Sequence, residues 1–306
     1  MIAWHVAVGY RAAMPNQQQI RPILGGLLTL VALLGTACSG PPSSIASPTV
    51  VVEHPPLEYA CVRAPSPPEF AGDLNAGIWR LAPWTEEFRD IEGAERPDPK
   101  FRTRVKMLWD ETHLYVGCTM EEPDLWATYD QRDMIVFHEH DFEVFIDPDG
   151  DGNEYYEIEI NVLGTIFDLF LHRPYRSGGP AEHGWDTSNL KFAIHTDGTI
   201  NDPGDRDRGW TVELAIPFAD LKPPSTRADG TRWSLPPITE HQRNISPRIG
   251  ETWRINFSRV EWDLEVVNAA YQKIEGRPEY NWTWTPQWEI NMHVPERWGL
   301  LRFVGE

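Results

Sequence analysis

The sequence predicts an all-β protein whose main domain is a single antiparallel β-sandwich, and three observations support this fold class. Apolar and polar residues alternate with a period of two through most of the chain after Cys61. Gly and Pro together account for 50 of the 306 residues, which indicates frequent turns. No window has the pattern of a long amphipathic helix. Roughly eight to ten short strands separated by turn signals are typical of a β-sandwich.

The first 37 residues have the features of a secretory signal segment. Residues 23–37 form an uncharged apolar stretch preceded by Arg21. This stretch is too short for a comfortable membrane span, but it fits the hydrophobic part of a signal. Residues 1–13 do not resemble the start of a signal, so Met14 is an alternative start. We expect residues 1–37 to direct export.

The signal segment ends in small residues directly before Cys38. This arrangement resembles the lipobox of bacterial lipoproteins, in which the cysteine is lipidated and becomes the mature N-terminus, although Gly35 stands where that motif usually has leucine. An ordinary cleaved signal with an incidental cysteine is the alternative. Residues 38–61 are rich in Ser and Pro and are expected to form a tether before the domain at 62–306.

The remaining cysteines fit this layout. If Cys38 carries lipid, Cys61 and Cys118 are left, and export to an oxidising compartment permits a disulfide between them. Two separate buried thiols are the alternative, because spacing alone does not place the two Cα atoms within bridging distance.

The domain is predicted to consist of short strands joined by turns. The runs 103–109 and 114–118 flank a short polar turn and are expected to form a hairpin. In the next pair, 141–146 and 155–162, polar and apolar residues again alternate, so one face of each strand is expected to lie in the core. Further strands are predicted at 166–172, 191–195, 210–216, 252–260 and 300–304.

The chain is strongly acidic. Its formal net charge is −19, and all 46 acidic residues but only 25 of the 27 basic ones lie beyond the signal segment. Such a surface repels phosphate backbones and anionic lipids, which argues against nucleic-acid binding and against charge-driven docking on a membrane. The chain also contains 14 Trp, a residue favoured where a flat apolar face meets a polar ligand.

Several segments resemble the carbohydrate-binding module family 9, which belongs to the DOMON-like group of β-sandwiches. They are Arg104–Val116, Asp141–Gly150, Gly209–Pro217, Arg254–Val260 and Trp298-Gly299, together with Asp73 and Trp79 near the start of the domain. The resemblances follow one another in the order of the family. They imply sugar binding and calcium ions in structural roles.

A calcium loop is predicted directly after the strand at 141–146. Asp147, Asp149 and Asp151 stand at alternate positions, with glycines between and after them, and three such carboxylates can converge on a hard cation. The twelfth position of the loop is Ile158, where an EF-hand requires Glu, so an EF-hand is excluded. An Asp-Gly hairpin turn is the alternative, but three close carboxylates repel one another unless something neutralises them.

Two further polar clusters are candidates for ligand binding. His138 and His140 share one face if they lie in a strand and then offer two ligands to zinc, but a polar loop edge is the better interpretation because no third ligand stands at a suitable spacing. Glu143, Glu157 and Glu159 are expected on one open sheet surface, where carboxylates accept strong hydrogen bonds from sugar hydroxyls. Pairing with arginines of adjacent strands explains these acids equally well.

Tryptophans in predicted loops are candidates for stacking on a sugar ring, because a pyranose presents an apolar face of C–H groups. The loop tryptophans are Trp126, Trp185, Trp282 and Trp284, with Trp288 and Trp298 close to the last two. The strand tryptophans Trp109, Trp210 and Trp253 are expected in the core.

The resemblance also implies where a sugar would bind. In sugar-binding members two Trp side chains clamp a terminal sugar, and a Glu and an Arg assist. The Glu corresponds to Glu143 and the first Trp to Phe137, whereas the second Trp falls near Met292 and the Arg position holds Glu159. Phe137 can still stack on a sugar, and a loop Trp can supply the other wall.

The leading functional hypothesis is a non-catalytic carbohydrate-binding protein associated with carbohydrate catabolism. We expect it in a bacterial cell envelope, as an outer-membrane lipoprotein or in the periplasm, with a glycoside hydrolase as its partner. A glycoside hydrolase acting on O-glycosyl bonds through two carboxylates is the alternative, although no residue stands out as nucleophile or general acid. A second alternative is a haem-binding electron-transfer module of the DOMON type, with Met or His as axial ligands.

Overall fold

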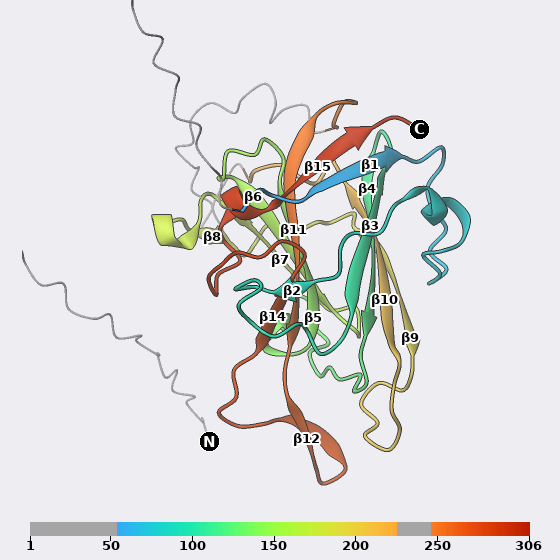
Figure 1. Cartoon of the computed structure of the whole chain (residues 1–306), viewed down its shortest axis with the longest axis vertical. Coiled ribbons are helices and arrows are strands. Elements are labelled where there is room, and N and C mark those ends of the chain that lie inside the picture. Colours follow the sequence, from blue (N-terminus) through green and yellow to red (C-terminus); the bar gives the residue numbers. More distant parts are fainter. Residues whose placement is uncertain (1–53, 225–245) are drawn as a thin grey trace, which may run out of the picture. The chain divides into compact units, whose positions relative to one another are not determined.

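The computed structural model describes residues 54–224 and 246–306, and their regular secondary structure is almost entirely β-strand (Figure 1). The strands are β1 (Glu58–Arg63), β2 (Arg89–Asp90), β3 (Thr103–Trp109), β4 (His113–Glu121), β5 (Asp141–Asp147), β6 (Tyr155–Asn161), β7 (Ile166–Leu171), β8 (Ala181–Glu182), β9 (Lys191–Asp197), β10 (Gly209–Pro217), β11 (Thr252–Glu261), β12 (Leu264–Val267), β13 (Ala270–Lys273), β14 (Tyr280–Thr283) and β15 (Gly299–Val304). Short 3-10 helices lie at η1 (Gly77–Leu81), η2 (Val136–His138), η3 (Tyr175–Ser177) and η4 (Pro295–Arg297).

The predicted signal segment 1–37, the lipidation candidate Cys38 and most of the tether lie outside the described residues. Among the residues that are described, no helix has the length and apolar character needed to cross a membrane.

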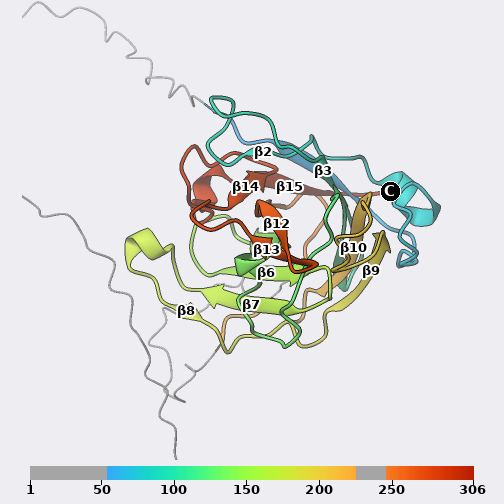
Figure 2. The same ribbon diagram turned by 90° about the horizontal axis from the view of Figure 1, so that it is seen from below.

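Most strands form one curled sheet whose two ends face each other across the core (Figure 2). The order along the sheet is β8-β7-β6-β5-β11-β15-β1-β3-β4-β10-β9, and β14 pairs with both β11 and β2. β12 and β13 form a separate hairpin. Side chains from both ends, such as Val144 on β5 and Val212 on β10, belong to one buried cluster. The predicted all-β sandwich is therefore confirmed.

β1 departs from the predicted antiparallel pattern. It runs parallel to β15, with Cys61 opposite Phe303, and parallel to β3 on its other side. These two neighbours come from distant parts of the chain, so no local sequence pattern could reveal the pairing. β1 also begins at Glu58, which places residues 58–61 in the sheet, where the sequence predicted tether.

The strands β5, β6 and β7 are buried on both faces. Their inner side chains, such as Phe142 and Ile158, pack into the main core. Their outer side chains, such as Phe145 and Leu169, are covered by residues of connecting segments, namely Ile91, Val136, Met292 and Trp298. Every residue of these three strands is buried as a result, including the polar residues that alternation places on the outer face.

The two cysteines of the domain are free and fully buried. Cys61 lies on β1 and Cys118 on β4, and β3 separates the two strands in the sheet. The structure thus has two separate thiols, and the alternative of a disulfide between them is not realised. Burial raises the pKa of both thiols well above the ordinary value and keeps them protonated.

A buried ion-pair network fixes β11 to the segment that follows β4. Arg259 is 1% exposed, and its Nη2 atom lies 2.7 Å from Glu122 Oε2 and 2.8 Å from Glu261 Oε2. His140 lies 3.3 Å from the same Glu122 oxygen. Burial opposes the charged form of His140, but Glu261 and Glu122 raise its pKa to about 9. His140 and Arg259 lower the pKa of Glu122 to about 2 against the effect of burial, whereas burial raises the pKa of Glu261 to about 7.

We predict that Arg259→Met destabilises the domain by about 3–5 kcal/mol, because Glu122 and Glu261 then stay buried without their main counter-charge. Urea unfolding followed by circular dichroism measures this loss. Arg208→Met is the control, since Arg208 pairs with Asp197 on the exposed surface and its loss should hardly move the unfolding midpoint. Equal midpoints for the two variants would show that the network is not stabilising.

Candidate functional site

The acids predicted to line an open sheet surface are buried. Glu143 and Glu159 lie directly opposite each other on β5 and β6, and they are 5% and 1% exposed. Asp141 and Glu157 lie on the same outer face and are also buried. The expectation of an open acceptor surface is wrong, because connecting segments cover this face of the sheet.

Burial governs the charge of this group. It raises the pKa of Glu143 to about 7 and raises the pKa values of Asp141, Glu157 and Glu159 well above their ordinary range. Repulsion from neighbouring carboxylates adds to the effect at Asp141, Glu157 and Glu159. We refer to Asp141, Glu143, Glu157 and Glu159 as the acid cluster.

The predicted calcium loop has a geometry that suits a cation. Asp147, Asp149 and Asp151 each offer an oxygen, and these oxygens lie within 4.8 Å of one another. The Asp147 carboxylate accepts hydrogen bonds from the backbone N–H groups of Gly150 and Gly152, both at 2.9 Å. Burial raises the pKa of Asp147 to about 7, and the neighbouring carboxylates contribute. The donor set therefore fits calcium, although the hydrogen bonds also suit the alternative of a plain turn.

His138 and His140, for which the sequence favoured a polar loop edge over a zinc site, lie in different surroundings. His138 is exposed at the end of η2, whereas His140 is buried in the network of Arg259. Phe137, the proposed stacking residue, is 37% exposed, and its carbonyl oxygen accepts a hydrogen bond from Trp262 Nε1 at 3.2 Å. Phe137 therefore remains accessible, and the interpretation of His138 as part of a polar loop edge agrees with the structure.

The loop tryptophans proposed as an exposed platform are buried. Their exposed fractions are 8% for Trp126, 6% for Trp185, 2% for Trp282 and 1% for Trp284. The last three belong to the main core: β14 pairs with β11 and carries Trp282 inward, and Trp185 packs against Tyr156. The expectation that they form an exposed platform is wrong. Trp284 alone among these four lines the pocket described next.

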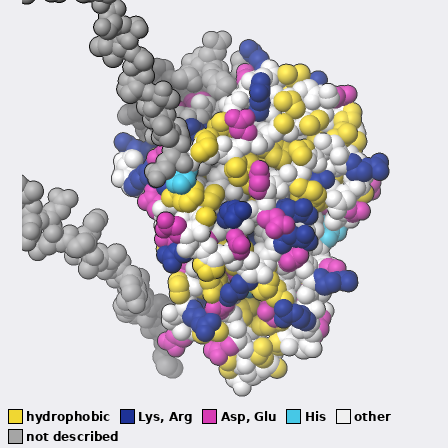
Figure 3. Space-filling view, viewed as in Figure 1, with side chains coloured by type: hydrophobic (Ala, Val, Ile, Leu, Met, Phe, Trp, Pro, Cys, Tyr) yellow, Lys and Arg dark blue, Asp and Glu magenta, His cyan; other side chains and the backbone are white. Residues whose placement is uncertain are grey.

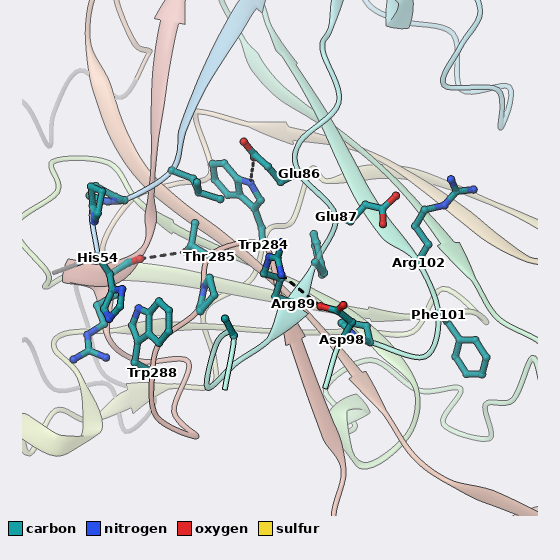
Figure 4. Close-up of a pocket in the computed structure, with 18 of the residues that line it drawn as sticks. His54, Glu86, Glu87, Arg89, Asp98, Phe101, Arg102, Trp284, Thr285 and Trp288 are labelled. Atoms are coloured by element: carbon teal, nitrogen blue, oxygen red, sulfur yellow. Dashed lines mark hydrogen bonds and ion pairs between the residues drawn. The ribbon is translucent and has the colours of Figure 1, made fainter. Parts of the chain in front are cut away.

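A pocket of about 1190 Å³ lies beside the segment that leads into β1 (Figure 4). Its walls come from the start of the described chain, the segments around β2, the end of β4 and the segment between β14 and η4. The aromatic residues among them are His54, Phe88, Phe101, Trp284 and Trp288. Its volume exceeds that of a typical site for a drug-sized ligand, so it has room for more than one sugar ring.

Trp288 is held in place by an uncommon backbone conformation. Its φ is +62°, which is rare for a bulky residue. The Trp288 N–H donates to the carbonyl of Ile91 at 2.9 Å, and the indole packs so tightly over Gly93 that a Cβ there would lie 2.1 Å from the ring. His54 stacks on the indole, with ring centroids 3.6 Å apart (Figure 4). Gly93 and His54 therefore hold the ring in place, and a sugar that stacks on the face covered by His54 must displace the imidazole.

The polar groups of the pocket carry both charges. Arg102 pairs with Glu121 at 3.0 Å, and the Trp284 Nε1–H donates to Glu86 at 3.1 Å. The pocket is lined by Glu86, Glu87, Asp98, Glu121 and Glu296 against Arg89, Lys100, Arg102 and Arg297. Figure 3 likewise shows acidic and basic side chains interspersed over one face of the domain. A ligand here meets both hydrogen-bond donors and acceptors.

The comparisons with known proteins place the chain among carbohydrate-binding domains. The family model described as carbohydrate family 9 binding domain-like matches residues 71–236. A solved structure of a protein from Bacteroides uniformis ATCC 8492 has a TM-score of 0.51 at 15% identity, with 81% of this chain and 98% of that chain covered, and it shares the fold. No curated protein matches.

Two further solved structures are of a family 9 carbohydrate-binding module from Caldicellulosiruptor kristjanssonii. The complex with cellotriose has a TM-score of 0.46 and the complex with glucose 0.45, both at 15% identity. Each comparison covers 81% of this chain, and 94% and 96% of those chains respectively.

We predict that Gly93→Ala is more destabilising than Gly276→Ala. Both glycines have positive φ, +84° and +77°, so both variants should lose about 1–2 kcal/mol through backbone strain. Only at Gly93 does the new methyl group collide with Trp288, which should add about 1–3 kcal/mol. Urea unfolding provides the comparison, and the additional loss should disappear in a Trp288→Ala background. Equal losses at the two glycines would show that the indole is not fixed over Gly93.

Proposed function

Because the chain belongs to the carbohydrate family 9 binding domain-like family, we propose that it binds carbohydrate in the pocket lined by Trp284 and Trp288. The ligand class is a neutral oligosaccharide. The protein acts as a non-catalytic binding protein in carbohydrate catabolism and serves a glycoside hydrolase as partner.

The observation that carries this proposal is the combination of a positioned indole with a rim of balanced charge. The apolar face of a sugar ring stacks on an aromatic side chain, and its hydroxyls both donate and accept hydrogen bonds. A phosphorylated or strongly anionic ligand would instead require an excess of Arg and Lys, whereas five acids and four bases line this pocket.

We predict that Trp288→Ala weakens oligosaccharide binding at least about tenfold, which corresponds to about 1.4 kcal/mol, because the stacking surface is lost. A glycan array identifies the ligand, and isothermal titration calorimetry gives the dissociation constants. Phe192→Ala removes another exposed aromatic side chain, on β9, and should leave affinity unchanged.

Phe137→Ala distinguishes this pocket from the position that the sequence resemblance implied. Binding that survives Trp288→Ala and is lost in Phe137→Ala would place the sugar next to the acid cluster and refute the pocket. Release of reducing sugar from a bound glycan by the wild-type protein would favour the hydrolase alternative.

The N-terminal features suggest where the protein acts. We propose that residues 1–37 direct export and that Cys38 is lipidated, which anchors the protein in the bacterial cell envelope. Cys38→Ser should then abolish incorporation of radiolabelled palmitate and release the protein from the membrane fraction of a bacterial host. Unchanged fractionation of the variant would argue for an ordinary cleaved signal.

Calcium binding by the loop of Asp147, Asp149 and Asp151 is a separate proposal, supported by the three converging oxygens. Titration of calcium into the wild-type protein and into Asp149→Ala should show one binding event fewer in the variant. Identical heats and stoichiometry would leave the loop as a hydrogen-bonded turn.

A further inference from the structure

The acid cluster concentrates carboxyl groups on a buried sheet face. Asp141 and Glu143 project from the same face of β5, and Glu159 lies directly opposite Glu143 on β6. Like charges at directly opposed positions destabilise a pair of strands, and burial increases the cost because water no longer screens them. Asp141 and Glu159 are 1% exposed, and Glu143 is 5% exposed.

No protein cation compensates these carboxyl groups. In the two described ranges, no ion pair with Lys, Arg or His involves Asp141, Glu143, Glu157 or Glu159. The contrast with the nearby network is informative, because there Glu122 and Glu261 are equally buried but contact Arg259. Asp141 Oδ1 accepts a hydrogen bond from the Val260 N–H at 3.3 Å, but this neutral donor does not offset the charge of the carboxylate.

Several oxygens of the cluster also lack any hydrogen-bond donor. Asp141 Oδ2, Glu143 Oε2 and Glu159 Oε2 are completely inaccessible to water and have no hydrogen-bond partner among the described groups. Buried polar atoms are rarely left in this state without an ion or ordered water to satisfy them. One oxygen from each of the three residues lies within 4.8 Å of the others.

This spacing allows the three oxygens to share one cation. Oxygens that bind calcium at 2.3–2.6 Å from the metal are at most about 5 Å apart, so oxygens within 4.8 Å of one another can bind the same calcium ion. All the donors are carboxylate oxygens, which favours a hard cation over zinc or copper. Ser258 is fully buried opposite Glu143 on β11 and adds a hydroxyl oxygen beside the cluster.

We propose that Asp141, Glu143 and Glu159 form a second divalent-cation site, of the size and hardness of calcium, within the sheet. This site is separate from the loop of Asp147, Asp149 and Asp151, and it does not depend on carbohydrate binding. The cation links β5 to β6 and neutralises charge that no side chain offsets. Its role is structural, because the ion lies beneath the segments that cover the sheet.

The experiment uses the full-length protein stripped of metal with a chelator. Asp149→Ala serves as the background, because it isolates the second site from the loop. Calcium chloride is titrated into this protein by calorimetry, and its melting temperature is measured with and without calcium. The comparison protein is the triple variant Asp149→Ala, Glu143→Gln, Glu159→Gln. Gln keeps the shape of Glu and removes the repulsion, so the triple variant should fold and should melt higher than its background when both lack metal.

The expected result is one calcium bound by Asp149→Ala, with a rise in melting temperature. In the triple variant, affinity should fall at least about tenfold and the rise should disappear. The proposal is overturned if calorimetry of Asp149→Ala shows no heat of calcium binding and its melting temperature does not change with calcium. The cluster would then hold protons only. Equal calcium binding by both proteins would overturn it as well, by placing the ion elsewhere. Oligosaccharide titration of the same proteins shows whether carbohydrate binding is independent of this site.

Discussion

The burial of both faces of β5 and β6 determines most of the chemistry of this domain. In a sheet with one solvent-exposed face, carboxylates on that face stay in water without a desolvation cost. Strands in which apolar and polar residues alternate usually belong to such a sheet. Here connecting segments that carry Ile91, Val136 and Met292 close over the outer face. Carboxyl groups that alternation directs outward are then enclosed, and each must find a proton, a cation or a hydrogen bond. Arg259 meets this need for Glu122 and Glu261, whereas no such cation contacts Asp141 and Glu143, although Arg259 lies beside them in register on β11.

Much of the fold could be predicted because the strands are locally encoded. The runs around β3, β4, β5 and β6 alternate clearly, and their core-facing residues, such as Val105 and Ile158, occupy the interior as expected. The parallel position of β1 could not be predicted, since it depends on β15 at the far end of the chain. The covering of the outer face depends on irregular segments, which carry no periodic signal.

The candidate site was less predictable than the fold for a related reason. Abundance of Trp pointed to aromatic recognition, but the sequence could not separate Trp282, which enters the core from β14, from Trp288, which lines a pocket. The decisive signals are a positive φ at Trp288 and close packing on Gly93, and both exist only in three dimensions. Charged residues of the pocket come from segments around β2 that alternate poorly. Exposure and backbone geometry, more than residue type, identify the residues that are available to a ligand.

The position of β1 constrains when the domain can fold. The strand lies between β15 and β3, so the middle of the sheet is completed only when Glu58–Arg63 pairs with Gly299–Val304. Without β15, edges of both β1 and β11 lack a partner strand. Contacts between such distant segments form slowly, because the loop between them must first close. The pairing of β1 with β15 is therefore a long-range contact that slows the folding of the domain.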